Sequence, residues 1–355
     1  MEKFNLYAKR PLIISGPCSA ESEEQLLTTC QALAAEGCVD VLRAGIWKPR
    51  TRPDTFEGVG IKGLPWLAKA KRVTGLPIAT EVASAKHVES ALAFGVDMLW
   101  IGARTTVNPF LVQEIADALR GSDVSLLIKN PMNPDIELWS GAVARFAKAG
   151  FTQERLGLIH RGFSVSGHWM YRNDPMWHLV FDMQSRFPEM MMICDPSHIG
   201  GHRDHIATLS QTAANLNYGG LMIESHCSPS KALSDAQQQL TPEALGDLVR
   251  QISWRAERSD DATYLRDLER CRTEIDQIDS EIFDLLSRRM NIADRIGEIK
   301  RDNDVIILQS QRWASIVERI ISRSAELGLS KEFLRTTLEA IHVESIEHQN
   351  RIMNK

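Results

Sequence analysis

The chain of 355 residues lacks any hydrophobic run approaching the roughly 20 residues that a membrane-spanning helix needs. Its 6 cysteines are irregularly spaced and form no CxxC pair, so we expect reduced thiols rather than a disulfide framework. Basic residues are not in excess, because 41 Lys and Arg stand against 46 Asp and Glu, and this balance argues against a nucleic-acid partner. The start holds only a short apolar patch, so we expect no signal peptide and a cytoplasmic protein that binds no membrane.

Proline is absent from the last part of the chain. All 14 prolines lie at or before Pro242, and glycine is rare beyond that point. Both residues are costly inside helices, so the end of the chain is expected to be helical. The length allows two domains, and the composition changes at the polar segment ERSDDAT. We predict a first domain, a linker and a second domain over residues 1–256, 257–264 and 265–355.

Before that boundary, short apolar runs alternate with amphipathic stretches. Continuous apolar runs are typical of parallel strands that are covered on both faces. Eight strand–helix units favour a (β/α)8 TIM barrel, with an open, doubly wound sheet as the alternative. The eight runs are PLIISG (11–16), VDVLRAG (39–45), LPIATEV (76–82), DMLWIGA (97–103), SLLIKN (125–130), LGLIHRG (156–162), MMMICDP (190–196) and GLMIESH (220–226).

Each run carries a charged or metal-ligating side chain at or just past its C-terminal end. In a TIM barrel this rim is where active sites are built. Strand ends also become polar simply because they reach solvent, and this explains single cases. It explains less well why all eight runs do so, and why their side chains form two chemical sets.

The first set is cationic. Arginine binds phosphate and carboxylate through two parallel hydrogen bonds, and lysine acts as a point charge. So many cations on one rim would repel one another without an anionic ligand, which indicates a substrate set with several negative charges. Solvated surface residues are the alternative for each one taken alone. The set comprises Arg43, Lys48, Arg50, Arg104, Lys129 and Arg161.

The second set consists of residue types that bind metals: Cys18, His198, Glu224 and Asp235. A thiolate together with carboxylates and imidazole suits a first-row transition ion better than magnesium or calcium. Manganese is the expected ion, with iron, cobalt or zinc as alternatives. The spacing of these residues is weak evidence, and a buried structural thiol is the alternative for Cys18.

The motifs of the first domain resemble 3-deoxy-D-arabino-heptulosonate 7-phosphate (DAHP) synthase, more narrowly the type I beta subfamily whose core is a bare barrel. The resemblance implies a metal-dependent condensation of phosphoenolpyruvate with erythrose 4-phosphate. The motifs are GPCSAES (16–22), LRAGIWKPRT (42–51), IGARTT (101–106), IKNP (128–131), HRGF (160–163), DPSHIGG (195–201) and IESHCSPSKALSDAQQQL (223–240).

The resemblance also implies a role for each site residue. The metal ligands would be Cys18, His198, Glu224 and Asp235. The phosphate of phosphoenolpyruvate would be held by Arg104, Lys129 and Arg161. Its carboxylate and reacting centre would meet Arg43 and Lys48. The erythrose phosphate would be bound by Arg50 and Thr51, with Thr105 as a helper.

Two further roles concern proton transfer. Lys48 is the candidate donor to the forming alkoxide, and Glu81 is the candidate for activating water, although Glu81 could equally be only a partner of Arg43 or Lys48. The chain departs from the family pattern at Arg52, where Ser is common, and at Val107-Asn108, where Gln-Asn is frequent. Both departures adjoin the side expected to bind the sugar phosphate.

A sibling barrel family makes 3-deoxy-octulosonate 8-phosphate from the same enol donor. It typically carries a KANRTS-like segment, whereas this chain has KPRT at 48–51. The segment therefore favours the four-carbon aldose.

The C-terminal region shows a seven-residue apolar repeat over YLRDLERCRTEIDQIDSEIFDLLSRRMNIADRIGEIKRDN. It predicts one helix of about 37 residues, roughly 55 Å long, followed by shorter helices near 309–328 and 331–352. A helix of that length must bury its apolar stripe, so we expect this three-helix domain to dimerise. The repeat runs through two lines, Leu268, Ile275, Ile282, Arg289 and Ile296, and Ile278, Leu285, Ile292 and Ile299.

Arg289 interrupts the apolar line. An arginine in a helix seam is costly unless it is paired or binds an anion. Lys300 shares its face of the helix about 16 Å along the axis, whereas Arg272 lies about 25 Å away and about 100° round. Arg272 would therefore serve a second site across a dimer axis. The alternative is that Arg289 extends to solvent or pairs with an acid.

The same region resembles the all-helical chorismate mutases over about residues 265–352. The resemblance implies that cations clamp the two carboxylates of chorismate, and that Lys300 and Gln349 bond its ether oxygen. Gln309 stands where an acid is frequent, and Trp313 stands where a Glu often touches the substrate hydroxyl. The implied site residues are Arg272, Arg289, Lys300, Arg312, Ser345 and Gln349.

Together these features predict a bifunctional shikimate-pathway enzyme, a homodimer through its helical domain. We also expect the mutase product prephenate to inhibit the synthase, with phenylalanine or tyrosine at the barrel surface as the competing effector. The alternative function keeps the barrel enzyme and makes the helical domain a non-catalytic dimerisation and ligand-sensing module.

Overall fold

The computed structural model describes residues 4–48, 55–165 and 170–354. Contacts divide the chain into two compact units, Met1–Glu257 and Arg258–Lys355, and each is described by itself. Within the described residues, no helix combines the length and the apolar character needed to cross a membrane.

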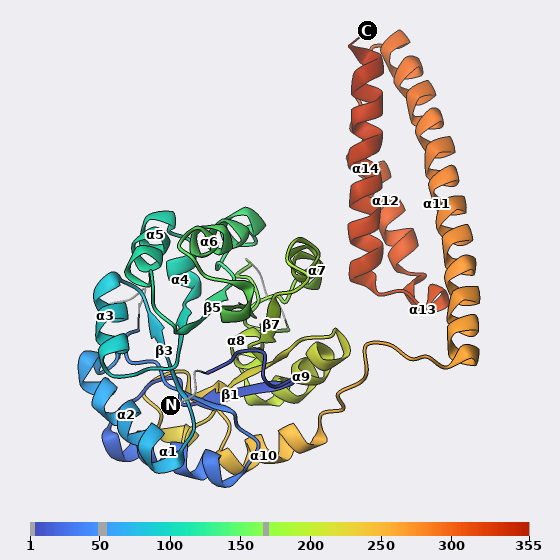
Figure 1. Ribbon diagram of the computed structural model, residues 1–355. Coiled ribbons are helices and arrows are strands. Elements are labelled where there is room, and N and C mark those ends of the chain that lie inside the picture. Colours follow the sequence, from blue (N-terminus) through green and yellow to red (C-terminus); the bar gives the residue numbers. More distant parts are fainter. Residues whose placement is uncertain (1–3, 49–54, 166–169, 355) are drawn as a thin grey trace. The chain divides into compact units, whose positions relative to one another are not determined.

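The first unit is a closed barrel of parallel strands in chain order, with β8 pairing with β1 (Figure 1). Each of the eight predicted runs supplies one strand, so the predicted TIM barrel is confirmed and the open sheet is wrong. The strands are β1 (Leu12–Gly16), β2 (Val41–Arg43), β3 (Ile78–Val82), β4 (Met98–Ile101), β5 (Ser125–Lys129), β6 (Leu156–His160), β7 (Met191–Cys194) and β8 (Gly220–Glu224).

Helices surround these strands (Figure 1). Several begin at a side chain that caps the first turn, as Ser22, Asn108 and Asp135 do by accepting backbone N–H groups. The helices are α1 (Glu23–Ala35), α2 (Gly63–Thr74), α3 (Ala85–Ala93), α4 (Ala103–Thr106), α5 (Pro109–Ala118), α6 (Ile136–Lys148), α7 (Trp177–Arg186), α8 (Pro196–Gly200), α9 (Ile206–Asn215) and α10 (Pro242–Gln251). Short 3-10 turns are η1 (Gly60–Lys62), η2 (Gln153–Arg155), η3 (Arg203–His205), η4 (Pro229–Lys231) and η5 (Ala236–Gln238).

The core forms two layers because strand side chains alternate between the barrel interior and the helix layer. Leu12 and Ile14 belong to one buried cluster, and Ile13 between them belongs to the other. Leu6 joins the interior cluster, and the neighbouring Tyr7 hydroxyl donates to Leu156 O at the start of β6. The N-terminal segment therefore lies at the N-terminal ends of the strands, opposite the rim where the site is expected.

The second unit is helical, as predicted, and consists of α11 (Ala262–Asp302), α12 (Ser310–Ile321), α13 (Ser324–Leu327) and α14 (Lys331–Met353). Gly297 of α11 approaches Gln349 of α14 so closely that a Cβ would lie 3.2 Å from its Cα. The predicted second helix is interrupted between α12 and α13, where Ser322 Oγ donates to Arg319 O. Such a bond offers the backbone an alternative to a continuous helix.

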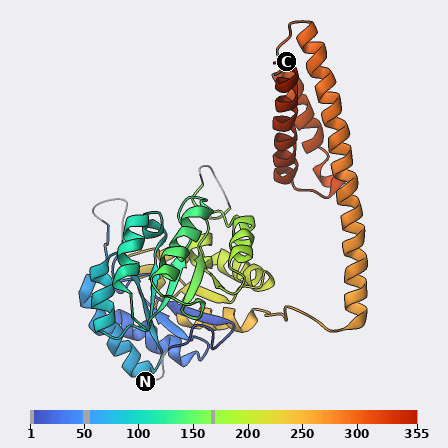
Figure 2. The ribbon, with the colours of Figure 1, turned by 45° about the horizontal axis from the view of Figure 1, so that its top comes forward.

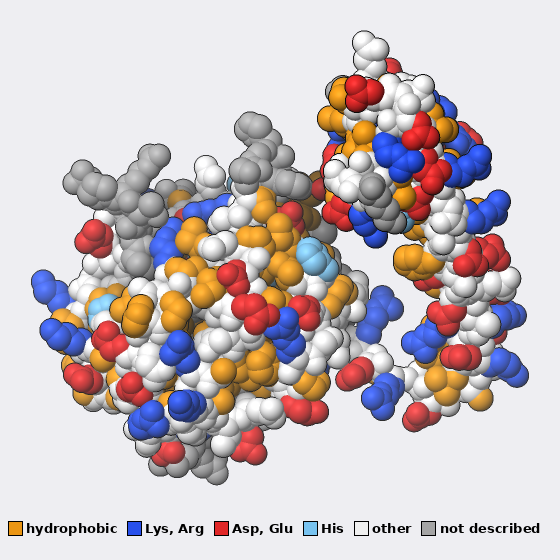
Figure 3. Space-filling model, turned by 90° about the horizontal axis from the view of Figure 1, so that it is seen from above, with side chains coloured by type: hydrophobic (Ala, Val, Ile, Leu, Met, Phe, Trp, Pro, Cys, Tyr) orange, Lys and Arg blue, Asp and Glu red, His pale blue; other side chains and the backbone are white. Residues whose placement is uncertain are grey.

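The N-terminal part of α11 extends beyond the helices that pack on its C-terminal part (Figures 1 and 2). Apolar side chains of the predicted stripe are exposed along it, among charged ones (Figure 3). Examples are Ile275, Ile278, Ile282 and Leu285, each about half exposed. Within the described chain these side chains lack a covering partner, which is costly for a surface of this size.

Candidate active sites in the barrel and in the helical domain

The ionisable side chains of the barrel gather at the C-terminal ends of its strands. Arg43, Lys129 and Glu224 are the last residues of β2, β5 and β8. Asp195 directly follows β7, and Cys18 comes two residues after β1. In a parallel barrel these ends share one rim, so residues far apart in sequence meet there.

Three of the four predicted metal ligands form a tight cluster. Ligand atoms of Cys18, Glu224 and Asp235 all lie within 4.8 Å of one another. The thiol of Cys18 donates to Asp235 Oδ2 at 3.3 Å. His198 lies beside them, with Nε2 3.8 Å from Glu224 Oε1 and Nδ1 3.0 Å from Asp195 Oδ1. An Nδ1–H that donates to Asp195 leaves Nε2 free to bind a metal, the usual arrangement around a histidine ligand.

The electrostatic surroundings of Cys18 are unusual for a structural thiol. Burial, followed by the charge of Glu224, raises its pKa to about 12, and Lys48 acts in the opposite direction. Lys48 Nζ donates to the sulfur at 3.3 Å. The sulfur thus lies beside two carboxylates, and thiolate with carboxylates is a donor set that fits a divalent transition ion.

Arg43 is fully buried and serves the cluster from β2. Its guanidinium donates to Glu224 Oε1 at 3.2 Å and to Cys18 O at 3.1 Å, and it lies over the ring of Trp100. Its Nε has no hydrogen-bond partner in the described part of the chain. An unpaired buried donor on a cation is a binding group still available to an anion.

The predicted phosphate-binding cations lie at or just after the ends of the neighbouring strands β4, β5 and β6. Lys129 Nζ is 2.7 Å from Asp195 Oδ2. Burial would raise the pKa of Asp195, but His198 and Lys129 hold it well below its ordinary value. Burial lowers the pKa of Arg161 to about 10, and the charge of Arg104 contributes in the same direction. The charges of Arg104 and Arg161 are therefore close enough to repel one another.

The remaining predicted rim residues lie partly inside and partly outside the described residues. Thr105 is buried in the short helix α4, beside Arg104. Arg50 and Thr51, and the departure at Arg52, lie outside the described residues. Asn108, part of the other departure, caps helix α5 through its side chain.

Glu81 of β3 accepts a hydrogen bond from Trp100 Nε1 at 3.1 Å. A Cβ at position 102 would collide with its carboxylate, so Gly102 is needed to accommodate it. Among the described residues, no ion pair joins Glu81 to Arg43 or Lys48. Its proposed role in activating water stays a prediction.

The helical unit has its own pocket of about 310 Å³ between α11, α12 and α14. It brings together the predicted residues Arg289, Lys300, Arg312, Ser345 and Gln349. Arg272 is exposed on the N-terminal part of α11 and does not line this pocket, in keeping with its predicted place at a second site.

Two cations of this pocket donate to neutral oxygens rather than to carboxylates. Arg289 donates to the hydroxyl of Ser345, and Lys300 donates to Ile307 O. Burial lowers the pKa of Arg289 and of Lys300. Gln349 Oε1 is buried without a hydrogen-bond partner among the described residues. Partly buried cations without carboxylates suit an anionic ligand.

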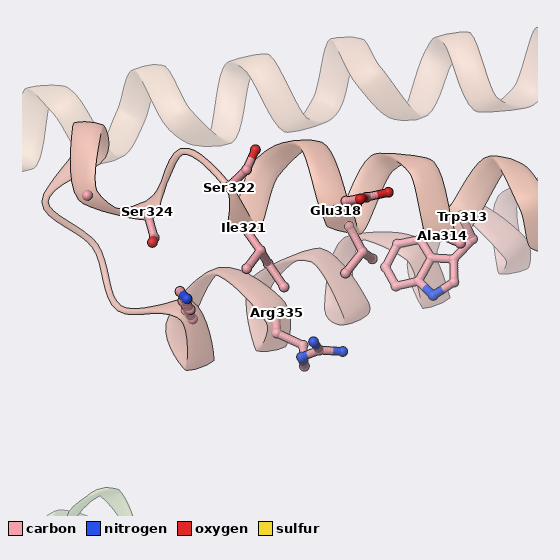
Figure 4. Close-up of a pocket in the computed structure, with 10 residues that line it drawn as sticks. Trp313, Ala314, Glu318, Ile321, Ser322, Ser324 and Arg335 are labelled. Carbon is pink, nitrogen blue, oxygen red and sulfur yellow. The ribbon is translucent and has the colours of Figure 1, made fainter.

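Trp313 and His342 form an aromatic wall of this pocket. Their rings stack at 4.1 Å, and Gln309 also lines the pocket. Trp313 borders a second, wider groove of about 740 Å³ as well, together with Ile321 of α12 and Arg335 of α14 (Figure 4). An aromatic wall therefore stands where the resemblance leads one to expect a carboxylate.

Comparisons with known proteins match both parts of the chain to known families. The family described as DAHP synthetase I family matches residues 7–258. The chain belongs to this family. The family described as chorismate mutase type II matches residues 271–350. The chain is therefore a bifunctional enzyme of aromatic biosynthesis, with a DAHP synthase domain and a chorismate mutase domain.

Individual relatives match about two thirds of the chain. The phospho-2-dehydro-3-deoxyheptonate aldolase of Thermotoga maritima is 33% identical over 242 residues, or 68% of this chain and 68% of the relative. A crystal structure of the Thermotoga maritima DAHP synthase superimposes with a TM-score of 0.60 at 31% identity, over 68% of this chain and 67% of that chain. The 2-dehydro-3-deoxyphosphooctonate aldolase of Wolinella succinogenes is 31% identical over 272 residues, or 68% of this chain and 97% of the relative.

Sequence reasoning placed Asp195 at the DAHP synthase rim without assigning it a role, and it missed three further polar residues there. Asp195 bonds both His198 and Lys129. Arg172, Gln238 and Gln239 contact the clustered ligands or their backbone. The position of Asp195 directly after a strand is the signal that placed it at the rim. Gln238 and Gln239 lie inside the motif at 223–240, but neither they nor Arg172 received a role, because glutamine and a loop arginine are ordinary surface residues.

Proposed function

We propose that the barrel condenses phosphoenolpyruvate with D-erythrose 4-phosphate and water to DAHP plus phosphate, and that the helical domain rearranges chorismate to prephenate. The observation that carries the synthase proposal is the approach of Cys18, Glu224 and Asp235 to within 4.8 Å, on the rim that also holds the cations. Both activities belong to one pathway. The free state of all 6 cysteines fits the cytoplasm as the place of action.

In this proposal Cys18, His198, Glu224 and Asp235 hold a divalent transition ion, for which manganese is the first candidate and iron, cobalt or zinc are others. A donor set of thiolate, imidazole and carboxylate supports that class of ion. When bound, the ion supplies Lewis-acid polarisation of a carbonyl oxygen.

The side chains of the rim account for the remaining chemistry. Arg104, Lys129 and Arg161 bind the phosphate of phosphoenolpyruvate, and Arg43 receives its carboxylate. The methylene carbon attacks the aldehyde, positive charge develops at the carbon that bears the phosphate, water adds there, and phosphate leaves by C–O cleavage. Lys48 donates the proton that the new alkoxide needs. Glu81 is the candidate base for the water.

The mutase step needs no covalent or acid–base catalyst. The cations at 289, 300 and 312, with Arg272 from a partner subunit, clamp the two carboxylates of chorismate in a compact conformer. Lys300 and Gln349 stabilise the ether oxygen, whose negative charge grows as its bond breaks. Gln349 Oε1 has no partner among the described residues, so turning the amide over would direct its Nε2–H group, a donor, toward the ether oxygen.

Dimerisation through α11 supports this clamp. The exposed apolar stripe of α11 needs a partner surface, and a second copy of α11 offers a matching one. A two-fold dimer would also bring Arg272 of one subunit toward the pocket of the other.

The decisive test assays both activities on the intact chain with and without a chelator. We expect the chelator to abolish the synthase activity and to leave the mutase activity unchanged, because the candidate metal ligands all lie on the barrel. Mutase activity lost with the chelator, or synthase activity retained, would contradict the proposal. Absent mutase activity in the untreated chain would favour the non-catalytic helical module.

The sibling reaction is the second candidate, because relatives such as the Wolinella enzyme carry the name of an octulosonate aldolase. Supplying arabinose 5-phosphate in place of erythrose 4-phosphate separates the two. We expect turnover with the four-carbon aldose to exceed that with the five-carbon aldose, and the reverse order would assign the barrel to the sibling reaction.

A further inference from the structure

Three consecutive glutamines, residues 237–239, begin two positions after Asp235 at the turn η5, and their side chains have different environments. Gln237 is exposed, whereas Gln238 and Gln239 are 1% and 0% exposed. Buried amides need hydrogen-bond partners for both their N–H and their carbonyl groups. Each of these two amides has one partner in the candidate metal cluster.

Gln239 holds the loop that carries Cys18. Its Oε1 accepts from the backbone N–H of Cys18 at 2.9 Å, and its Nε2 donates to Ser234 O at 2.8 Å. The neighbouring residues are joined too, because the hydroxyls of Ser19 and Ser234 lie 2.7 Å apart. Gln239 thereby fixes the loop after β1 against the loop after β8.

Gln238 connects two of the clustered carboxylates. Its Nε2 donates to Glu224 Oε2 at 2.7 Å, and its Oε1 accepts from Arg172 Nη1 at 2.9 Å. The same Nη1 donates to Asp235 Oδ1 at 2.9 Å. Because a carboxylate can only accept and a guanidinium can only donate, these contacts fix the orientation of the amide.

These contacts give the two oxygens of each carboxylate different partners. Glu224 Oε2 is bonded to Gln238, while Oε1 lies on the side of His198. Asp235 Oδ1 is bonded to Arg172, while Oδ2 lies 3.3 Å from the sulfur of Cys18. One oxygen of each group is thus held by Gln238 or Arg172, and the other faces the clustered ligands, where Glu224 Oε1 also accepts from Arg43 Nη1 at 3.2 Å.

Neighbouring backbone features make room for this arrangement. Asp235 has a positive φ of 47°, which is uncommon for a residue with a side chain. A Cβ at position 201 would collide with the side chain of Arg172, so Gly201 allows that arginine to cross the rim. Arg172 reaches Asp235 and Gln238 from a segment more than 60 residues earlier.

We propose that Arg172, Gln238 and Gln239 are positioning residues for the metal site, which set the direction of the Glu224 and Asp235 carboxylates and the place of the Cys18 thiolate. This inference rests on the proposed metal-dependent function. Outer partners of this kind typically contribute 10–100-fold to metal affinity, because they hold the ligands in the binding geometry before the ion arrives.

The test uses the full chain and the substitutions Gln238→Met and Gln239→Met, with Gln237→Met as the matched control. Methionine is similar in length to glutamine but lacks the amide. Thermal unfolding in the presence of chelator first establishes that each variant folds. Calorimetric titration with Mn²⁺ alone then gives the affinity, and absorption spectra with Co²⁺ report the thiolate contact of Cys18.

We expect Gln238→Met to bind Mn²⁺ about 10–100-fold more weakly, while Gln237→Met stays within about twofold of the unaltered chain. Gln239→Met is expected to weaken the thiolate-to-cobalt absorption band at saturating Co²⁺, whereas Gln238→Met retains that band. Unchanged Mn²⁺ affinity in Gln238→Met, or an unchanged cobalt band in Gln239→Met, would overturn the inference.

Failure of the underlying function gives a different result, because the unaltered chain would then bind neither ion. Arg172→Met provides a second route if Gln238→Met does not fold, since the Arg172 side chain is 48% exposed and its loss leaves the core intact. The same loss of Mn²⁺ affinity is expected there, and equal affinity to the unaltered chain would overturn the proposed role.

Discussion

Cys18 belongs to the candidate synthase site and not to the mutase pocket, because its sulfur contacts side chains of the barrel. Glu224, Asp235 and Lys48 surround it, and its buried thiol keeps a pKa of about 12. A thiol with so high a pKa gives up its proton only to a strong competitor such as a metal ion.

Cys18→Ala is expected to abolish metal-dependent synthase activity and to leave mutase activity largely intact. The substitution removes one ligand from the barrel, and the helical pocket is built from other residues. Metal content by atomic absorption and the two rate assays check this. Normal metal content together with a normal synthase rate would refute the assignment of Cys18.

Arg289→Ala and Lys300→Ala are each expected to lower the mutase rate by about 10²–10³-fold, because each removes a preorganised donor to developing charge. Steady-state kinetics on variants with an unchanged helical circular dichroism spectrum measure the effect. His348→Ala is the control, since His348 pairs with Asp294 and lies outside the pocket lining. A folded variant that loses less than about tenfold would remove its residue from the clamp.

At the scale of elements, α11 has two halves with different partners. Its C-terminal half packs on α14 and carries Arg289 and Lys300, whereas its N-terminal half carries Arg272 and an exposed apolar stripe. A single helix thus offers one set of pocket residues to its own subunit and, in the proposed dimer, one residue to its partner.

Mixing two inactive variants tests this sharing. In a heterodimer of Arg272→Ala and Lys300→Ala subunits, one of the two pockets has all its cations, so unfolding and refolding an equal mixture should restore about a quarter of the normal activity. Mutase rates before and after mixing measure the recovery. If the mixture shows no more activity than its separate components, Arg272 acts within its own subunit or not at all.

At the scale of the whole molecule, two catalytic units share one chain, and the mutase product is an anion that the helical pocket would bind. We propose that prephenate inhibits the synthase through the helical domain. Such coupling requires prephenate to bind one global state more tightly than another, and typical couplings give 5–150-fold effects.

Prephenate titration of the synthase assay is expected to inhibit the intact chain and to spare both Arg289→Ala and a barrel truncated near Asp260. Phenylalanine and tyrosine are titrated in parallel as the competing effectors. Inhibition by prephenate that persists in the truncated barrel would move the regulatory site to the barrel, and no inhibition of the intact chain would leave the helical domain as a second catalyst only.

The sequence determined the elements of this protein, because each depends on local patterns. The apolar runs formed all eight strands, and proline-poor heptads formed the long helix. It also indicated which residue types collect at the rim, since parallel strands in a barrel end on one side. The resemblance to known families named Cys18, Glu224 and Asp235, and these three are brought together.

Only the tertiary structure decided how the site is supported. Arg172, Gln238 and Gln239 have no distinctive local pattern, and their contacts join segments separated by up to 221 residues. Whether a buried amide faces Cys18 or solvent depends on how the loops after β1 and β8 meet, and loop packing is not encoded in periodicity. Likewise, the stacking of Trp313 on His342 depends on the approach of α12 to α14, which the hydrophobic pattern of either helix alone does not specify.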